Sequence, residues 1–190
     1  HAVDMTLEAG AWIVPTQELF SLFFRDPDVG TLMKRDELKY MSLRTRESWE
    51  QRARDMAEGK NAYIDKNRQT LLKAMADGGV GIALGSDAPQ VFSVPGFSII
   101  REVEIMKAAG LTPWQILVAG IKNPGIYFND KDDFGLITSS HRADFVLLDD
   151  NPLDDIMNVD KQAGVMVAGR WYSKEVIDAR LADIAERMSE

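Results

Sequence analysis

The stretch Val80-Gly81-Ile82-Ala83-Leu84-Gly85-Ser86-Asp87 decides how this chain folds. It begins as an apolar run interrupted only by glycine, and two polar residues follow directly. Such a run, bounded by turn residues, indicates a strand that is buried on both faces, as strands of parallel sheets are. Ala11-Trp12-Ile13-Val14 lies between Gly10 and Pro15 and has the same character. The sequence therefore predicts two buried strands.

Segments typical of helices surround the two strands. Thr112-Pro113 is a strong helix start, because a hydroxyl can cap the helix and proline fits its first position. Alternation of buried strands with helices favours an α/β fold, with a parallel sheet or part of a barrel. We expect residues 1–9 to be the end of a helix, and further helices at Asp36–Met41, Arg46–Glu58, Ala62–Asp77 and Phe97–Ala109, and from Thr112 to Ile121. One broad face of Ala62–Asp77 is apolar and holds Ile64, Leu71, Leu72 and Met75.

The residues after 130 follow a different pattern, with short apolar runs instead of long helices. Ala168-Gly169 separates two of these runs and predicts a hairpin. The predicted strands are Leu136-Ile137, Ala143–Leu148, Val165–Val167 and Arg170–Tyr172. Lys174–Met188 predicts a terminal helix that carries on one side the apolar residues Val176, Ile177, Leu181, Ile184 and Met188.

The composition excludes several classes of protein. Of 190 residues, 45% are hydrophobic and 27% are charged, which is typical of a globular chain. The net charge is -8 and no run is rich in Lys or Arg, so we expect no nucleic-acid and no membrane partner. The apolar runs are far shorter than the roughly 20 residues of a membrane helix. The absence of cysteine excludes a disulfide scaffold and a Cys-ligated zinc site.

Asp87 is the candidate site residue, because it directly follows a predicted strand. Ligands of parallel α/β folds bind beyond the carboxyl ends of the strands, where an acidic side chain can bind a metal or take a proton. Gly85 would let a ligand or another backbone approach closely. The alternative is that Asp87 caps a turn, because Asp-x-Pro, here Asp87-Ala88-Pro89, is common turn chemistry.

Other motifs give weaker signals. No Gly-x-Ser-x-Gly is present, which excludes the nucleophile elbow of a Ser-His-Asp hydrolase. The histidines are His1 and His141, which cannot share one helix as a metal-binding pair. Asp130–Asp133 is not an EF-hand, since Phe134 occupies the third acidic position, so we interpret it as a solvated loop. The loop over residues 16–33, with its three phenylalanines, lines a pocket wall or packs in the core.

Several stretches share their order and approximate spacing with a known family along nearly the whole chain, except over residues 24–76. They are Gly10–Thr16, Gly81–Ala88, Glu102–Pro113, Asn123-Pro124, Gly135–Ile137, Ala143–Asp149, Asn151–Leu153 and Val165–Arg170. Together they resemble the C-terminal part of the metal-dependent amidohydrolase superfamily, in its prolidase and imidazolonepropionase-like branch.

This resemblance implies a (β/α)₈ barrel that binds one or two divalent metals, usually zinc. The ligands in such enzymes are a His-x-His pair after the first strand, often a carboxylated Lys, two later His, and an Asp after the eighth strand. Asp87 matches that last Asp. The resemblance implies that Asp87 binds the metal, takes a proton from the attacking water and passes it to the leaving nitrogen.

The resemblance covers only part of such an enzyme. A full barrel needs roughly 250 residues, and this sequence offers about two barrel strands, the seventh and the eighth, and no His-x-His. We expect residues 1–130 to be the C-terminal portion of the barrel and residues 131–172 to be part of a small β-sandwich domain. Residues 173–190 would form a terminal helix.

We therefore expect the full-length protein to hydrolyse C–N bonds in small amides, cyclic amides, dipeptides or urea-like compounds, with a divalent metal such as zinc. A single Asp does not hold a catalytic metal, so this chain alone should bind none and be inactive. The alternative is a non-catalytic, degenerate or split subunit that acts by assembly. Isolated parallel strands leave exposed edges, so we expect a missing N-terminal barrel segment or a homo-oligomer partner. We expect a cytoplasmic location.

Overall fold

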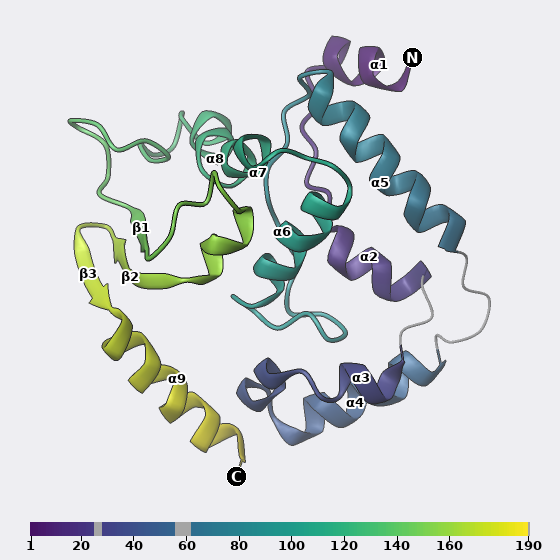
Figure 1. Ribbon diagram of the computed structural model, residues 1–190, viewed down its shortest axis with the longest axis vertical. Coiled ribbons are helices and arrows are strands. Elements are labelled where there is room, and N and C mark those ends of the chain that lie inside the picture. Colours follow the sequence, from purple (N-terminus) through teal and green to yellow (C-terminus); the bar gives the residue numbers. More distant parts are fainter. Residues whose placement is uncertain (25–27, 56–61, 190) are drawn as a thin grey trace.

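The computed structural model describes residues 1–24, 28–55 and 62–189, and helices dominate the part before residue 128 (Figure 1). These helices are α1 (Ala2–Glu8), α2 (Gln17–Phe24), α3 (Val29–Leu32), the 3₁₀ helix η1 (Asp36–Tyr40), α4 (Leu43–Asp55), α5 (Ala62–Asp77), α6 (Ser98–Ala108), α7 (Pro113–Gly120) and α8 (Lys122–Tyr127). The remainder holds β1 (Phe145–Leu148), η2 (Ile156–Asp160), β2 (Gln162–Val167), β3 (Arg170–Ser173) and α9 (Lys174–Ser189).

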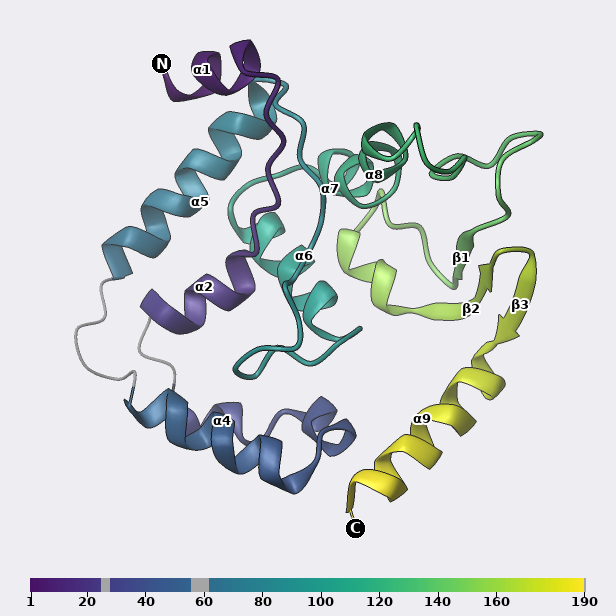
Figure 2. The same cartoon turned by 180° about the vertical axis from the view of Figure 1, so that it is seen from behind.

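The two predicted strands lie side by side and run parallel, as both views of the ribbon show (Figures 1 and 2). The N–H of Ile13 donates to the carbonyl of Gly81, and the N–H of Ala83 donates to the carbonyl of Ile13, each at 2.9 Å. Their predicted extent is wrong, because this single bridge at Ile13 and Ile82 is all the parallel pairing that the described residues make. Burial on both faces is also wrong for the first segment, since Val14 is 55% exposed.

Helices α5, α6 and α7 cover one side of the paired segments and bury a common core. The predicted apolar face of α5 is half right: Leu72 and Met75 are buried, whereas Ile64 and Leu71 are 38% and 46% exposed. Full burial of such a side chain stabilises a fold by about 1.5–3 kcal/mol, so this core holds the parallel segments in place. Its buried members are Leu72, Met75, Val80, Ile82, Val103, Met106, Leu111, Ile116, Ala119 and Ile156.

A second core joins α2, α3, η1 and α4 to the loop that follows Asp87. Trp49 of α4 lies against Phe92 of that loop, with 6.0 Å between the ring centroids. The helix predicted at Arg46–Glu58 is found as α4, and residues 56–58 of that prediction lie outside the described residues. The buried members are Leu22, Leu32, Leu38, Trp49, Ala53, Val91, Phe92 and Val94.

The C-terminal part forms a three-stranded antiparallel sheet in the order β1-β2-β3. Ala168 and Gly169 have φ of 48° and 77°, and this pair of positive angles is what a tight hairpin turn requires. The strand predicted at Leu136-Ile137 is wrong: it is irregular, and Ile137 is 87% exposed because no described strand pairs with it. Helix α9 has nearly the predicted bounds, and it extends away from the end of β3 (Figure 1). None of its residues is buried.

The chain thus has an α/β fold with a helical part, a small sheet and a last helix. The boundaries predicted at residues 130 and 172 stay predictions. Within the described ranges, no helix is both long enough and apolar enough to cross a membrane.

Candidate functional site

The two parallel segments end at the same edge, in two strained turns. Thr16 follows the first segment with φ of 45°, and Asp87 follows the second with φ of 55°. Residues other than glycine rarely adopt this left-handed backbone, and a β-branched residue such as Thr16 does so at particular cost. Strain of this kind persists only where the surroundings enforce it, and it clusters at functional sites.

Asp87 is exposed at this edge, and its carboxylate accepts a hydrogen bond from the Gln90 side chain at 2.9 Å. The turn continues with a bond of 2.8 Å from the N–H of Ser93 to the carbonyl of Gln90. Phe92, which is 1% exposed, anchors this turn in the second core. Both interpretations of Asp87 are therefore compatible with the structure: its side chain braces a turn, and the same side chain is accessible to a ligand.

Helix α6 packs beneath the edge and carries polar residues on its buried face. Ser98, at its start, bonds to Ser86 with 2.9 Å between the two hydroxyl oxygens. One turn later, Glu102 is fully buried, and its carboxylate accepts the N–H of Gln17 at 2.9 Å and the N–H of Glu18 at 2.7 Å. Burial raises the pKa of Glu102 to about 7, although these two hydrogen bonds favour the charged form.

A second carboxylate, that of Glu18, lies at the start of α2 and is 2% exposed. Arg35 donates to it at 2.9 Å and to the carbonyl of Phe92 at 3.0 Å. Burial raises the pKa of Glu18, and the ion pair with Arg35 opposes this rise. Arg35 thus ties α2 to the turn that carries Asp87.

Arg68 of α5 supports the first turn from the other side. It donates to the carbonyl of Pro15 at 2.8 Å and to the side-chain oxygen of Gln17 at 3.3 Å. Its guanidinium lies 3.9 Å from the ring centroid of Phe20, and burial lowers its pKa. The same helix places Asp65, 1% exposed, where it accepts the hydroxyl of Ser21 at 2.8 Å.

Sequence reasoning found Asp87 but missed Glu102 and Arg68 as supports of the edge. A signal for Glu102 does exist. Ser98, Glu102 and Met106 follow one another at helical spacing on α6 and all are buried, so a charged residue falls on the core face of the predicted helix. A buried charge in such a stripe needs partners, and these partners come from a distant part of the chain.

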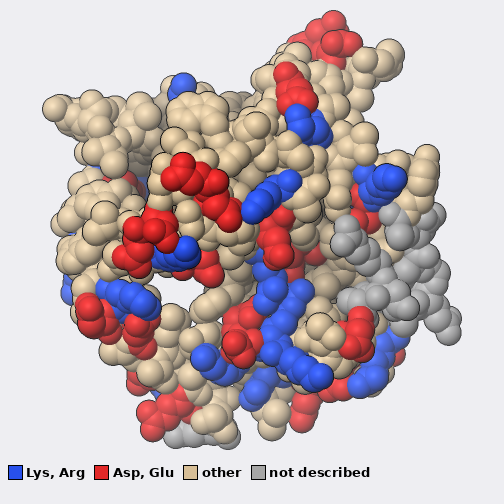
Figure 3. Space-filling model, in the orientation of Figure 1, with Lys and Arg blue, Asp and Glu red and all other residues tan. Residues whose placement is uncertain are grey.

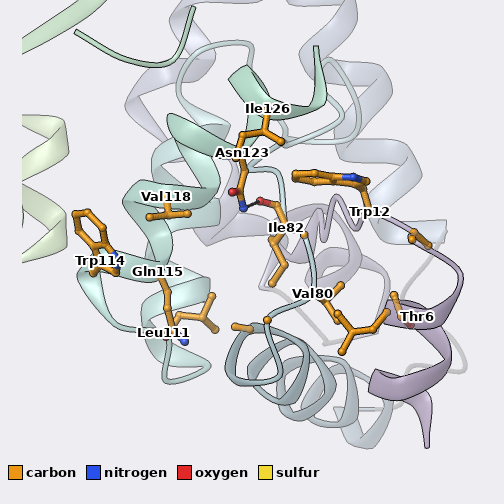
Figure 4. A pocket seen from close by; sticks show the side chains of 16 residues that line it. Thr6, Trp12, Val80, Ile82, Leu111, Trp114, Gln115, Val118, Asn123 and Ile126 are labelled. Atoms are coloured by element: carbon orange, nitrogen blue, oxygen red, sulfur yellow. Dashed lines mark hydrogen bonds between the residues drawn. The ribbon is translucent and has the colours of Figure 1, made fainter. Parts of the chain in front are cut away.

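A hollow of about 460 Å³ lies at the opposite end of the parallel segments. It is lined by the amino-terminal halves of both segments, Gly10–Trp12 and Gly79–Ile82, and by α7 and α8 (Figure 4). There the side-chain amide of Asn123 donates to the carbonyl of Ile82 at 2.7 Å. Asp87 does not line this hollow, so we do not assign the hollow to the candidate site.

A smaller hollow of about 240 Å³ lies beside the first turn, and Thr16, Phe20 and Arg68 line it. The rings of Phe20 and Phe24 are stacked with centroids 6.1 Å apart, and Phe20 also contacts Phe23. The phenylalanines of α2 therefore contact one another, and of the three only Phe20 lines the hollow.

The described residues do not make a metal centre by themselves. No group of three or more His, Cys, Asp or Glu among them is arranged to hold a metal ion. Asp87 offers a single carboxylate, which does not fit a catalytic metal without ligands from elsewhere. On the face in Figure 3, acidic and basic side chains are interspersed, so that face presents no broad basic surface for a polyanion.

The chain is similar to one known family and to several solved structures. The model described as "Amidohydrolase family" matches residues 3–172. A solved bottromycin amidohydrolase is 22% identical with a TM-score of 0.75, over 94% of this chain and 40% of that one. A Xaa-Pro dipeptidase is 21% identical with a TM-score of 0.61, over 90% and 37%. At this identity the likeness shows the fold alone.

A putative prolidase from Bifidobacterium longum is 18% identical with a TM-score of 0.54, over 95% of this chain and 40% of that one. The chain therefore spans less than half the length of the structures that it matches. A search of curated proteins found no match.

Proposed function

Because this chain belongs to the amidohydrolase family, we propose that it is part of a hydrolase that cleaves C–N bonds. The substrate class is small amides, cyclic amides, dipeptides or urea-like compounds. One observation carries the proposal: Asp87 is accessible at the carboxyl edge of a parallel pair, within the stretch that matches the family. Active sites of α/β barrels are built at that edge.

We further propose that the first 130 residues are the last portion of a (β/α)₈ barrel, with the two segments that pair at Ile13 and Ile82 belonging to its seventh and eighth strands. The sheet β1-β2-β3 would belong to a small β-sandwich, with α9 after it. The single parallel bridge supports this proposal, because it leaves most backbone groups of both segments free to pair with further strands. A missing N-terminal barrel segment, or a second copy of the chain, would supply them.

In this proposal Asp87 contributes one ligand to a divalent metal, which we take to be zinc, and the other ligands come from the missing strands. Such a metal lowers the pKa of water to about 7 and polarises a carbonyl oxygen. The role of Asp87 is to accept a proton from the attacking water and to donate it to the nitrogen of the leaving group. Its exposure and its hold by Gln90 suit a side chain that must be placed firmly and yet reach a substrate.

The test uses the longer protein that contains the remaining barrel strands, loaded with zinc. It is assayed against dipeptides, cyclic amides and ureas, with Asp87→Asn as the variant. Asparagine keeps the shape but cannot carry the proton, so we expect kcat/KM to fall by about 10²–10⁴-fold. Asp130→Asn, the same change at an exposed loop residue, is the matched control and should leave kcat/KM unchanged.

Two outcomes would contradict the proposal. If Asp87→Asn keeps wild-type kcat/KM, Asp87 is only a turn residue. If no C–N substrate is cleaved although zinc is bound, the hydrolase function is wrong.

A further inference from the structure

Helix α6 contacts both turns at the carboxyl edge through two buried side chains one helical turn apart. Ser98 bonds to Ser86, the neighbour of Asp87, at 2.9 Å. Glu102 accepts the N–H groups of Gln17 and Glu18, which directly follow Thr16. Because both side chains belong to one rigid helix, α6 sets the position of one turn relative to the other.

The Thr16 turn is held on both sides by groups from distant elements. Arg68 binds the carbonyl of Pro15 before it, and Glu102 binds the amides after it. The first N–H groups of any helix lack partners within that helix, and here a carboxylate from α6 serves those of α2. This external hold is what keeps a β-branched residue at φ of 45°.

Thr16 lies level with the Asp87 turn. Val14, two residues earlier, lies so close to Gly85 that a Cβ there would come within 2.6 Å of its Cγ1. The two segments are thus in tight contact just before both turns. A small shift of α2 would therefore move Thr16 relative to Asp87.

We propose that Glu102 is a positioning residue, whose carboxylate fixes the Thr16 turn beside Asp87 in the geometry needed to hold an amide substrate. This inference rests on the proposed hydrolase function. Glu102 touches neither substrate nor metal and acts through the backbone of α2. Ser98 does the same for the Asp87 turn.

The surroundings of Glu102 make this hold dependent on pH. Glu18 faces it from α2 and repels its negative charge, whereas Arg68 of α5 attracts it. In addition, Arg35 forms an ion pair with Glu18, and the negative charge of Asp65 interacts with the positive charge of Arg68. A carboxylate accepts both N–H groups, but a protonated acid gives up part of that capacity, so the hold is strongest above neutral pH.

The first experiment needs no activity. Amide hydrogen exchange of Gln17 and Glu18 is measured from pH 6 to pH 8 in the wild-type chain, in Glu102→Gln and in Glu104→Gln. Glu104 is an exposed glutamate on the same helix and is the matched control. After correction for the intrinsic rate, wild type and Glu104→Gln should gain protection at both amides as pH rises, by about tenfold. Glu102→Gln should show no such step.

The second experiment uses the active longer protein. We expect Glu102→Gln to lower kcat by tenfold or more and to remove a step near neutral pH from the kcat/KM profile, while Glu104→Gln keeps both. A merely structural Glu102 would change stability without moving the pH profile. Wild-type kcat and profile in folded Glu102→Gln would overturn the inference.

The two proposals can fail separately. If the protein cleaves no C–N bond but the exchange step is present in wild type, the hydrolase function is wrong and the hold on α2 stands. If the protein is active and wild-type exchange shows no step, the role of Glu102 is wrong. If Glu102→Gln does not fold, two other measurements test the inference: the pH dependence of amide exchange in the wild type, and the kcat of Ser98→Ala. We expect the exchange step in the wild type and a tenfold lower kcat in Ser98→Ala, and the absence of both would overturn the inference.

Discussion

The helical part and the C-terminal sheet use charged residues in opposite ways. Around the carboxyl edge, Glu18, Asp65 and Glu102 are at most 2% exposed, and each has hydrogen-bond partners from another segment. In the C-terminal part the ion pairs lie at the surface, as in Lys161 with Asp150 and Lys174 with Asp178. Exposed pairs contribute little because water screens them, whereas buried ones must be satisfied or the fold pays a large penalty.

The helical part, and not the C-terminal sheet, therefore holds its polar side chains in a fixed geometry. The buried polar network fixes the geometry of two turns, which is what a binding or catalytic edge requires. In the C-terminal part, the strands are joined by backbone pairing, and Ile156, which is 1% exposed, inserts into the first core, whereas no residue of α9 is buried. Changes in the two parts should therefore differ in size and in kind.

The largest effect is expected in the core behind the Asp87 turn. Phe92→Ala removes a ring that is 1% exposed and packed on Trp49, so the free energy of unfolding should fall by about 3–5 kcal/mol. Ile137→Ala, at a residue 87% exposed in the C-terminal part, is the comparison and should change it by less than about 0.5 kcal/mol. Urea unfolding measures both, and equal losses would contradict the contrast between the two parts.

The next effect is the pH dependence that Glu102 gives to stability. Its pKa is about 7 in the folded protein and near 4.5 when unfolded, so between these values the folded state holds a proton that the unfolded state has released. The contribution of Glu102 to the free energy of unfolding therefore falls by on the order of 3 kcal/mol as pH rises from about 4.5 to 7. Above about pH 7 this contribution no longer changes with pH.

Glu102→Gln should remove this dependence, because glutamine does not titrate. Urea unfolding at pH 5 and at pH 8 checks it, with Glu104→Gln as the control that keeps the wild-type difference. An equal pH difference in Glu102→Gln and wild type would show that another group, such as Glu18, causes it.

A smaller effect is expected at the start of α7, which sequence reasoning located correctly. Thr112 accepts the N–H of Gln115, and the Gln115 side chain accepts the N–H of Thr112 in return. Thr112→Ala should cost about 1 kcal/mol in the free energy of unfolding. Thr112→Ser keeps the hydroxyl and should retain nearly all of the stability; equal losses in both variants would show that the cap contributes nothing.

The smallest effect is expected on α9. Lys174→Ala breaks an exposed pair with Asp178 one turn along the helix, and the thermal midpoint should stay within experimental error at physiological salt. A clear fall in the midpoint would mean that this exposed ion pair stabilises the fold, which would contradict the difference that we draw between surface pairs and the buried network.

Much of this protein was determined by local sequence. The cap at Thr112, the hairpin at Ala168-Gly169, α5, α6 and α9, and the position of Asp87 after an apolar segment all follow from neighbours in the chain. Their physics is short-range: a hydroxyl reaches the amide of a residue three positions on, and glycine permits a positive φ. The family resemblance has in part the same origin, because motifs such as Gly81–Ala88, Glu102–Pro113 and Val165–Arg170 overlap the Asp87, α6, Thr112 and hairpin segments.

Only the tertiary structure decided the rest. A strand forms along its whole length only where a neighbouring strand pairs with it. Among the described residues, the apolar runs at 11–14 and 80–85 pair with each other at one bridge only, and Leu136-Ile137 pairs with no strand. The apolar side of α9 is only half-buried, because η1 and the sheet cover it in part. The bonds from Glu102 to Gln17 and Glu18 join residues more than 80 positions apart. No local pattern predicts such a partner, because it depends on how whole helices pack and on where buried charges then find hydrogen bonds.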